Sequence, residues 1–307
     1  MPLSISVLIP VLNDKSGISN TLNSVMNQTI DHSEYEVIVC DNGSTDGTQK
    51  VVQNHMKIHP TIVFINESLQ SSYAARNKAI LKSQAPILVF IDSDMTCNPD
   101  WLSKIKMVFE KFKPDYVGSK VIVKPQSKSL PTIYNTLTSF HTEIEMDKNQ
   151  FSPTCCLSVK KSVFDKIGLF DDRLESGGDW EFGNRVHRHQ FKTYYANEVV
   201  VYHPSRSTFG QLIQKTQRVA RGKAQLKHYH PVLASGISRN YFKIKNYLPK
   251  APWKIQKKYR EGFSFSTFTI LMFCLYPTFS LVISFASYIS ESIKLKTNKT
   301  YQNQINQ

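Results

Sequence analysis

The sequence predicts an α/β fold in which helices cover both faces of a mixed, mostly parallel sheet. Short apolar runs alternate with helical patterns through the first half of the 307 residues, and acidic residues follow two of these runs. The hydrophobic content of 41% is sufficient for a core. Because ligands of such sheets bind beyond the carboxyl ends of the strands, we expect a site where the acidic residues lie.

The first half of the chain contains four expected strands, at residues 5–9, 36–40, 62–65 and 87–91. Helical patterns follow each of them, at residues 18–26, 48–55, 72–83 and 99–112. This alternation is typical of a parallel sheet. Beyond residue 115 the pattern is less regular, with strands expected at 118–123, 154–159 and 199–202 and helices at 162–167 and 180–189.

The positive charge of the chain is concentrated in one segment. Residues 206–260 hold 14 of the 38 Lys and Arg residues and no Asp or Glu, so the remaining 24 basic residues balance the 24 acidic ones. Nucleic acid, anionic lipid and a polyanionic substrate all suit such a segment. Residues 263–290, immediately after it, contain no charged residue. An uncharged stretch beside the basic segment favours anionic lipid as the partner of that segment and argues against nucleic acid.

The uncharged stretch at residues 263–290 is long enough to cross a bilayer. Its Ser and Thr content and Pro277 leave three interpretations open: a transmembrane span, a shallow or re-entrant membrane helix, and a buried soluble helix. Basic residues before an apolar stretch favour the cytoplasmic side, and the N-terminus shows no signal-peptide pattern. We therefore expect a membrane-associated protein whose catalytic part is cytoplasmic.

The cysteines offer little support for redox, metal or nucleophilic chemistry. None of the five forms a C-x-x-C motif, and no histidine stands in a recognisable partner motif for the tandem Cys155 and Cys156. Free cysteine is among the most buried residue types. All five are therefore expected to be reduced residues of the core.

Asp92 and Asp94 come directly after the strand expected at residues 87–91. Residues i and i+2 of a strand lie on the same side, so both carboxylates should lie at one edge of the sheet. Two hard oxygen ligands suit Mg²⁺ or Mn²⁺, which would neutralise a diphosphate. Spacing alone is at least as typical of a solvated turn that caps a helix.

The loop at residues 41–48, Asp-Asn-Gly-Ser-Thr-Asp-Gly-Thr, is rich in turn-forming residues. Taken alone it indicates a structural connection between a strand and a helix. It matches neither the G-x-G-x-x-G pattern of dinucleotide-binding folds nor the G-x-x-x-x-G-K-[ST] phosphate loop. The sequence therefore lacks the main motif that would indicate hydride transfer with a dinucleotide cofactor or the chemistry of P-loop proteins.

Five ordered segments between residues 4 and 222 resemble the family 2 glycosyltransferases, which have a GT-A fold. They are Val7-Leu-Ile-Pro10 with Asn13, the run from Glu36 through Asp41 to Thr48, Ala74-Ala-Arg76-Asn77, Phe90-Ile-Asp92-Ser93-Asp94, and Gly177-Gly-Asp179-Trp180-Glu181-Phe182. Each segment alone is weak. Their order and spacing together are specific.

The resemblance implies a donor site for a nucleoside diphosphate sugar. Asp41 would hydrogen-bond the nucleotide base, in a pocket lined by Pro10 and Asn13. Arg76 would lie near the base or the phosphates. Asp92 would approach the ribose.

The resemblance also implies a divalent cation, Mn²⁺ or Mg²⁺, held by Asp94 and bridging the diphosphate. His203, after the strand expected at residues 199–202, stands where related folds place a histidine that reaches the metal, although a single histidine after a strand also suits a structural role. Arg218 lies in a segment that in some membrane-bound relatives covers the acceptor or the diphosphate. Its charge could stabilise the leaving nucleotide or contact anionic lipid.

The family's catalytic base is commonly the Asp of a Glu-Asp pair that opens a helix. Asp179 matches that Asp, whereas Gly178 stands where the Glu is expected. The departure leaves Asp179 the first candidate for the base and Glu181 the second. Asp179 could instead serve only as a helix cap.

The resemblance thus predicts a GT-A nucleotide-diphospho-sugar transferase fold with a C-terminal membrane-associated helix. The expected divisions are a GT-A domain at residues 1–222 with donor half 1–115 and acceptor half 116–222, a basic juxtamembrane segment at 223–262, the membrane helix at 263–290 and a polar tail at 291–307. The implied reaction is inverting transfer from a nucleotide diphosphate sugar, with UDP-sugar expected, to a hydroxyl of a glycan, lipid-linked or other acceptor.

Two other functions remain open. A sugar nucleotidyltransferase of similar fold would need a Gly-rich basic loop after the first strand, which residues 10–17 offer only poorly. A noncatalytic membrane scaffold is favoured by Gly178 alone, and the retained Asp41, Asp94 and Asp179 argue against it.

Overall fold

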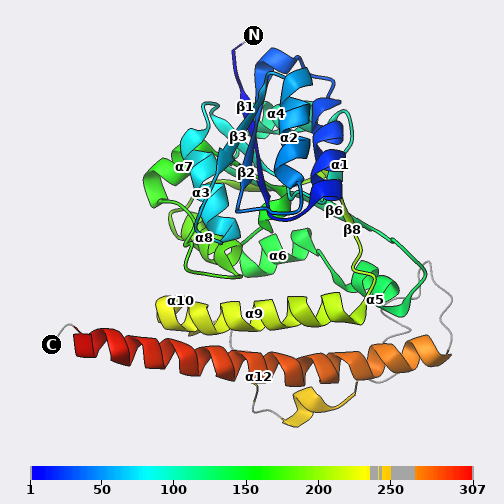
Figure 1. Ribbon diagram of the computed structural model, residues 1–307, viewed down its shortest axis with the longest axis vertical. Helices are drawn as coiled ribbons and strands as arrows, with labels where there is room; N and C mark the ends of the chain where they lie inside the picture. The colour runs from blue at the N-terminus through cyan, green and yellow to red at the C-terminus, as the bar shows by residue number, and fades with distance from the viewer. Residues whose placement is uncertain (1, 236–240, 242–243, 250–266, 306–307) are drawn as a thin grey trace. The chain divides into compact units, whose positions relative to one another are not determined.

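The computed structural model describes residues 2–235, 241, 244–249 and 267–305 (Figure 1). The chain divides into two compact units. The first comprises Met1–Lys124, Phe140–Arg173 and Gly178–Pro204. The second comprises Pro125–Ser139, Leu174–Gly177 and Ser205–Gln307.

The first unit is built on an eight-stranded sheet with the order β3-β2-β1-β4-β7-β6-β8-β5. The strands are β1 Ile5–Val11, β2 Tyr35–Asp41, β3 Ile62–Asn66, β4 Ile87–Phe90, β5 Thr96–Cys97, β6 Tyr116–Lys124, β7 Leu157–Lys160 and β8 Thr193–Pro204. Four pairs are parallel, β1 with β2, β2 with β3, β1 with β4 and β6 with β8. The mixed, mostly parallel sheet predicted from the sequence is confirmed.

The direction of each strand determines where the site lies. β7 is antiparallel to both β4 and β6, so β6 and β8 point the same way as β1 to β4. The carboxyl ends of these six strands therefore lie at one edge of the sheet. Asp41 ends β2, Asp92 and Asp94 follow β4, and His203 lies at the end of β8. Residues that are up to 162 positions apart in sequence thus reach the same edge.

Helices of the first unit cover the sheet. They are α1 Lys15–Met26, α2 Thr48–Ile58, α3 Ser72–Lys82, α4 Trp101–Phe112, α6 Thr142–Asn149, α7 Lys161–Ile167 and α8 Gly178–Arg188, with the 3-10 turns η1 His32–Glu34 and η2 Thr154–Cys156. Residues 154–156, predicted as strand, form η2 because Pro153 precedes them and its carbonyl accepts the Cys156 N–H at 3.1 Å. All five cysteines are buried and free, as predicted.

The main core lies between the sheet and the helices on one of its faces. Val7 and Ile9 of β1 pack in one buried cluster with Ile18 and Leu22 of α1 and Trp101 of α4. β1 is apolar along most of its length because it lies in the middle of the sheet and is covered on both faces. Complete burial of each such side chain contributes about 1.5–3 kcal/mol.

The second unit contains α5 Leu130–Thr138, α9 Phe209–Tyr229, α10 Pro231–Ala234, η4 Ile244–Tyr247 and α12 Thr267–Ile305. The start of the basic segment is helical in α9, which begins with a capping box between Thr208 and Gln211. Much of the predicted juxtamembrane segment lies outside the described residues. α12 continues through most of the predicted polar tail, and over Thr269–Thr297 it is long and apolar enough to cross a membrane.

Thr21 joins α1 to the loop that carries the two predicted site carboxylates. The residue is fully buried, and its hydroxyl lies 2.7 Å from the carbonyl oxygen of Ser93 and 2.6 Å from that of Met95. Thr21→Val keeps the shape and removes the donor. We expect it to lower the free energy of unfolding by about 1–3 kcal/mol, because the two carbonyls lose the one hydroxyl proton that they share.

Urea denaturation measures this change, and Thr21→Ser, which keeps the hydroxyl, is the control. Equal stability of Thr21→Val and the wild type would show that the hydroxyl does not hold the loop.

Candidate active site

The loops after β1 and β2 are joined by hydrogen bonds at the edge of the sheet. Asn13 accepts the Thr45 N–H through its side-chain oxygen at 2.8 Å and donates its own backbone N–H to the Ser44 hydroxyl at 2.8 Å. Its φ of 50° lies in the left-handed region, which Asn tolerates better than most residues. Pro10 pairs with Cys40, the neighbour of Asp41. Asn13 thus shapes the rim around Asp41.

Asp41 is fully buried and has one carboxylate oxygen engaged and one without a partner. Oδ2 accepts the N–H groups of Gly43 at 3.2 Å and Ser44 at 3.0 Å and the Gln49 amide at 2.9 Å. Oδ1 has no hydrogen-bond partner among the described residues. A buried acceptor without a donor is destabilising, so an N–H from a ligand would be favoured there.

Arg76 and Asp92 form an ion pair behind this loop. The guanidinium lies 2.7 Å from the Asp92 carboxylate, and its side chain is only 7% exposed. Burial opposes the charge of Arg76, but Asp92, Tyr73 and Asp179 together hold its pKa above the ordinary value. Arg76 also lies over the Tyr73 ring, with 5.5 Å between the guanidinium carbon and the ring centroid. This arginine therefore carries a fixed positive charge.

Asp94 and His203 approach each other at the ends of different strands. Nε2 of His203 lies 3.8 Å from the Asp94 carboxylate, whose side chain is 42% exposed. The other ring nitrogen, Nδ1, lies 2.6 Å from the carbonyl oxygen of Pro204, which can only accept. Nδ1 therefore carries a proton, and a neutral imidazole would direct its Nε2 lone pair toward the carboxylate. Two such electron-rich groups suit a cation between them.

A divalent cation fits this donor set, although the protein alone does not enclose it. No group of three or more His, Cys, Asp or Glu residues able to hold a metal occurs in the part of the chain that the structure describes. Mg²⁺-type ions usually bind one or two carboxylates and complete their coordination with substrate phosphates and water. Ser93, between the two aspartates, donates to Asp14 at 3.0 Å and so holds the loop.

Asp179 begins α8 beside Tyr73, a residue that the sequence analysis did not single out. The Tyr73 hydroxyl accepts the N–H of Gly178 at 2.9 Å and that of Asp179 at 3.3 Å, and it lies 3.5 Å from the Asp179 carboxylate. A Cβ at Gly178 would come within 2.8 Å of the Tyr73 ring. The ring therefore occupies the space that the expected Glu would need.

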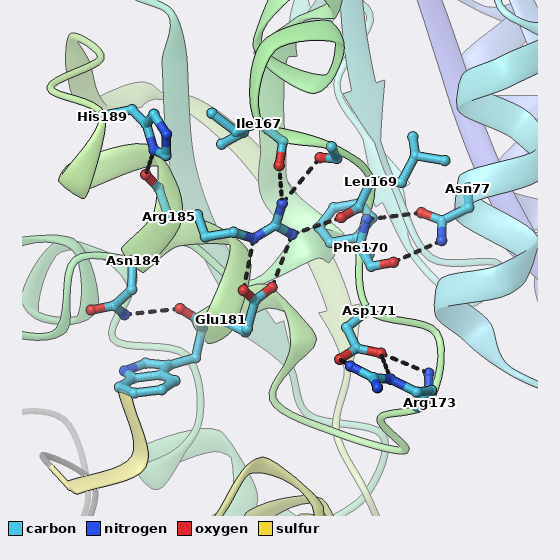
Figure 2. Close-up of polar contacts among 12 residues, drawn as sticks. Asn77, Ile167, Leu169, Phe170, Asp171, Arg173, Glu181, Asn184, Arg185 and His189 are labelled. Atoms are coloured by element: carbon cyan, nitrogen blue, oxygen red, sulfur yellow. Dashed lines mark hydrogen bonds and ion pairs between the residues drawn. The ribbon is translucent and has the colours of Figure 1, made fainter. Parts of the chain in front are cut away.

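Glu181, the second candidate for the base, is engaged in an ion pair (Figure 2). Its side chain is 4% exposed, and its two oxygens accept from Arg185 at 2.7 and 2.9 Å. Arg185 also donates to the carbonyls of Ile167 and Leu169. Asn77 pairs with both backbone groups of Phe170, at 2.8 and 3.0 Å. These contacts fix the loop before α8 and favour a structural role for Glu181.

The predicted site residues thus fall into two groups. Pro10, Asn13, Asp41, Arg76, Asp92, Asp94, Asp179, Glu181 and His203 all belong to the first unit. Arg218 lies exposed on α9 in the second unit, so its contact with a donor stays a prediction. Sequence reasoning missed Asp14 and Tyr73. An Asp three residues before Gly17 signals a helix cap for Asp14, whereas nothing local connects Tyr73 to a partner 106 positions away.

A mixed sheet whose carboxyl edge combines a buried aspartate after the second strand with a pair of aspartates after the fourth is typical of a GT-A nucleotide-sugar transferase. The chain belongs to glycosyl transferase family 2, whose model matches residues 6–168. It is 31% identical over 260 residues to glycosyltransferase AglE of Haloferax volcanii, covering 84% of this chain and 85% of that protein. The chain is therefore a glycosyltransferase that acts on nucleotide sugars.

Other known proteins are similar to this chain in sequence or in fold. A Methanococcus voltae dolichyl N-acetyl-alpha-D-glucosaminyl phosphate 3-beta-D-2,3-diacetamido-2,3-dideoxy-beta-D-glucuronosyltransferase is 25% identical over 75% of this chain and 76% of its own. The mannosyltransferase PcManGT of Pyrobaculum calidifontis, solved with GDP-Man and Mn²⁺, has a TM-score of 0.63 at 18% identity and covers 97% of this chain and 88% of its own. S. aureus TarS 1–349 with UDP-GlcNAc has a TM-score of 0.55 at 15% identity, over 98% and 92%. Both structures show the same fold.

Glu181→Gln should affect stability more than catalysis. The amide keeps the shape of the carboxylate and loses the charge that Arg185 compensates, so we expect the free energy of unfolding to fall by about 1–3 kcal/mol. Arg185→Met should destabilise by about 3–5 kcal/mol, because it leaves a buried carboxylate without its cation. Urea denaturation measures both changes.

Sugar transfer per folded molecule should stay close to the wild-type value in Glu181→Gln. Wild-type stability combined with lost transfer would instead make Glu181 the catalytic base.

Proposed function

We propose that this glycosyltransferase moves a sugar, with inversion at the anomeric carbon, from a nucleoside diphosphate donor to a hydroxyl of a lipid-linked or glycan acceptor at the cytoplasmic face of a membrane. The observation that carries the proposal is the carboxyl edge of the sheet, which holds both the buried Oδ1 of Asp41, without a hydrogen-bond partner among the described residues, and the Asp94–His203 pair. The first group suits a base, and the second suits a metal-bound diphosphate.

The base pocket selects the nucleotide. Asp41 accepts an N–H from the base through Oδ1, while its three contacts at Oδ2 keep the carboxylate from turning away. Uracil offers one imide N–H, which matches the single available oxygen. Pro10 and Asn13 complete the wall, and Asp92, held by Arg76, faces the ribose. We therefore propose a UDP-sugar as the donor.

The diphosphate lies at Asp94 and His203 in this proposal. Bound Mn²⁺ or Mg²⁺ would act there as a Lewis acid that neutralises the diphosphate leaving group. The protein contributes the carboxylate of Asp94, the Nε2 lone pair of His203 and the Pro204 carbonyl that fixes the tautomer. Arg76 adds a permanent charge nearby, and Arg218 of the second unit is a further candidate for contact with the phosphates.

Asp179 takes the proton of the acceptor hydroxyl. As the acceptor oxygen bonds to the anomeric carbon, the bond from that carbon to the diphosphate breaks, and the bonding electrons leave with the nucleotide. The hydroxyl proton passes to the Asp179 carboxylate. Asp179 lies at the start of α8, where the Trp180 N–H donates to its Oδ1 at 2.9 Å.

The acceptor class follows from the relatives and from α12. The Methanococcus voltae relative carries a dolichyl phosphate sugar in its name, and α12 is apolar enough to associate with a membrane. A lipid-linked sugar would present its hydroxyl at a membrane surface. We therefore favour a lipid-linked acceptor over a soluble glycan.

Substitutions at Asp94 and Asp179 should separate donor binding from transfer. Asp94→Ala should abolish metal-dependent binding of the donor, because the diphosphate then faces the remaining carboxylates without a bridging cation. Asp179→Asn should leave that binding near normal and lower transfer by roughly 10²-fold or more, the usual scale for loss of a general base. Calorimetric titration with Mn²⁺ and a radiolabelled transfer assay measure the two quantities.

Asp100→Asn, at an exposed carboxylate paired with Lys104, is the matched control and should change neither quantity. If Asp179→Asn retained full transfer, Asp179 would be only a helix cap and the proposed proton transfer would be wrong.

A further inference from the structure

One face of α12 presents an apolar stripe that is exposed among the described residues. Its members are all at least 37% exposed: Leu271, Leu275, Phe279, Val282, Ile289 and Ile293. Successive members are three, four or seven residues apart, so they lie on the same side of the helix. At 1.5 Å per residue the stripe is about 33 Å long. A soluble helix rarely exposes so continuous an apolar surface.

The opposite face of α12 packs against other helices of the second unit, α5 and α9. Phe273 contacts Tyr134 of α5, and Tyr276 contacts Phe209 of α9, with ring centroids 5.1 and 5.9 Å apart. Near the other end, Glu291 accepts from Gln225 of α9 at 2.9 Å. Figure 1 shows α9 and α12 running side by side between these contacts. The two helices therefore run together over this length.

α9 carries charges along this shared length. Lys215, Arg218, Arg221 and Lys223 all lie between its two contacts with α12. Charged side chains are costly in the hydrocarbon core, and Glu291 of α12 is also buried in this interface. If α12 crossed the bilayer, it would draw these groups into the core or separate from α9. Neither agrees with the packing.

We propose that α12 lies in the plane of the membrane surface and inserts its apolar stripe among the acyl chains of an anionic bilayer. The charge of the chain supports lipid as the occupant, because residues 206–260 hold 14 Lys or Arg and no acidic residue. Apolar residues on one face and cations beside them are typical of interfacial helices. This inference deepens the membrane association proposed above.

Depth measurements along the stripe distinguish the two orientations. Nitroxide labels are placed on the full-length protein at Leu271→Cys, Val282→Cys and Ile293→Cys, with Lys227→Cys of α9 as the control. The five native cysteines are buried and should not compete for the label. The protein is bound to phosphatidylcholine vesicles that contain about one third phosphatidylglycerol. Relative collision rates with oxygen and a water-soluble nickel chelate give each depth.

An in-plane helix predicts equal shallow depths for the three stripe labels, within a few ångström, and an aqueous environment for the Lys227 label. A spanning helix predicts that the Val282 label lies about 16 Å deeper than the other two, since eleven residues separate it from each. That profile would overturn the inference and leave membrane association intact.

Loss of the stripe should release the protein. Leu275→Glu with Val282→Glu should lower vesicle binding at least tenfold, whereas Leu81→Glu with Ile58→Glu, at exposed apolar positions of the first unit, should not. Full binding by the stripe variant overturns the inference. If the wild type fails to bind vesicles, or buries the stripe in a dimer, membrane association is wrong as well. Donor hydrolysis without vesicles tests the proposed transfer chemistry separately.

We also infer that Tyr73 is a positioning residue for Asp179, which rests on the proposed role of that carboxylate. The two N–H groups at the start of α8 occupy the lone pairs of the Tyr73 hydroxyl, so its single proton points toward Asp179. The ring also supports Arg76. The Tyr73 side chain thus contacts both Arg76, a residue of the proposed donor site, and Asp179, the proposed base. The absence of a side chain at Gly178 leaves room for the Tyr73 ring.

Tyr73→Phe keeps the ring and removes the hydroxyl. We expect kcat to fall roughly tenfold with the KM for donor unchanged, because Asp179 is displaced while Arg76 keeps its support. Tyr116→Phe is the control, since that buried hydroxyl accepts the backbone N–H of Ser152 at 2.7 Å and should affect stability only. Equal kcat in Tyr73→Phe and the wild type would overturn this inference. If Asp179→Asn were also fully active, the base assignment itself would be wrong.

Discussion

The ion pair between the buried Arg76 and the partly exposed Asp92 is the contact on which the rest of the site depends. It places a fixed cation at an edge where the ends of parallel strands bring several carboxylates together. Removing Arg76 would leave Asp92 uncompensated and would also remove the cation that lies over Tyr73. Arg76 therefore links Asp92, at the edge of the sheet, to Tyr73, whose hydroxyl contacts the start of α8.

The other carboxylates differ in their hydrogen-bond and ion-pair partners. These partners indicate what each carboxylate could bind. Asp41 has three protein donors on one oxygen and none on the other among the described residues, so a neutral N–H suits it. Asp94 is half-exposed and its carboxylate lies 3.8 Å from Nε2 of His203, an arrangement that suits a cation. Glu181 has a complete ion pair with Arg185 and needs no ligand. The same functional group thus serves three purposes in one unit.

Most of the first unit was predictable from the sequence because strand and helix periodicities are local. Four strands and their helices agree with the predicted ranges to within a few residues. The 3-10 turn at Thr154–Cys156 and the helix α9 were not predicted, since the first follows a proline and the second lies in a segment that was noted only for its positive charge. The roles of Tyr73 and Glu181 depend on partners found only in three dimensions, and no local pattern indicates them.

The central claim is that this edge binds a nucleotide sugar through a divalent cation. Calorimetric titration of the wild-type protein with UDP-sugars and GDP-sugars, in Mn²⁺ and again in EDTA, tests it most directly. Binding of a UDP-sugar should weaken at least about tenfold when the cation is removed, because the diphosphate then meets uncompensated carboxylates. Equal affinity in Mn²⁺ and EDTA, or no binding of any nucleotide sugar, would contradict it.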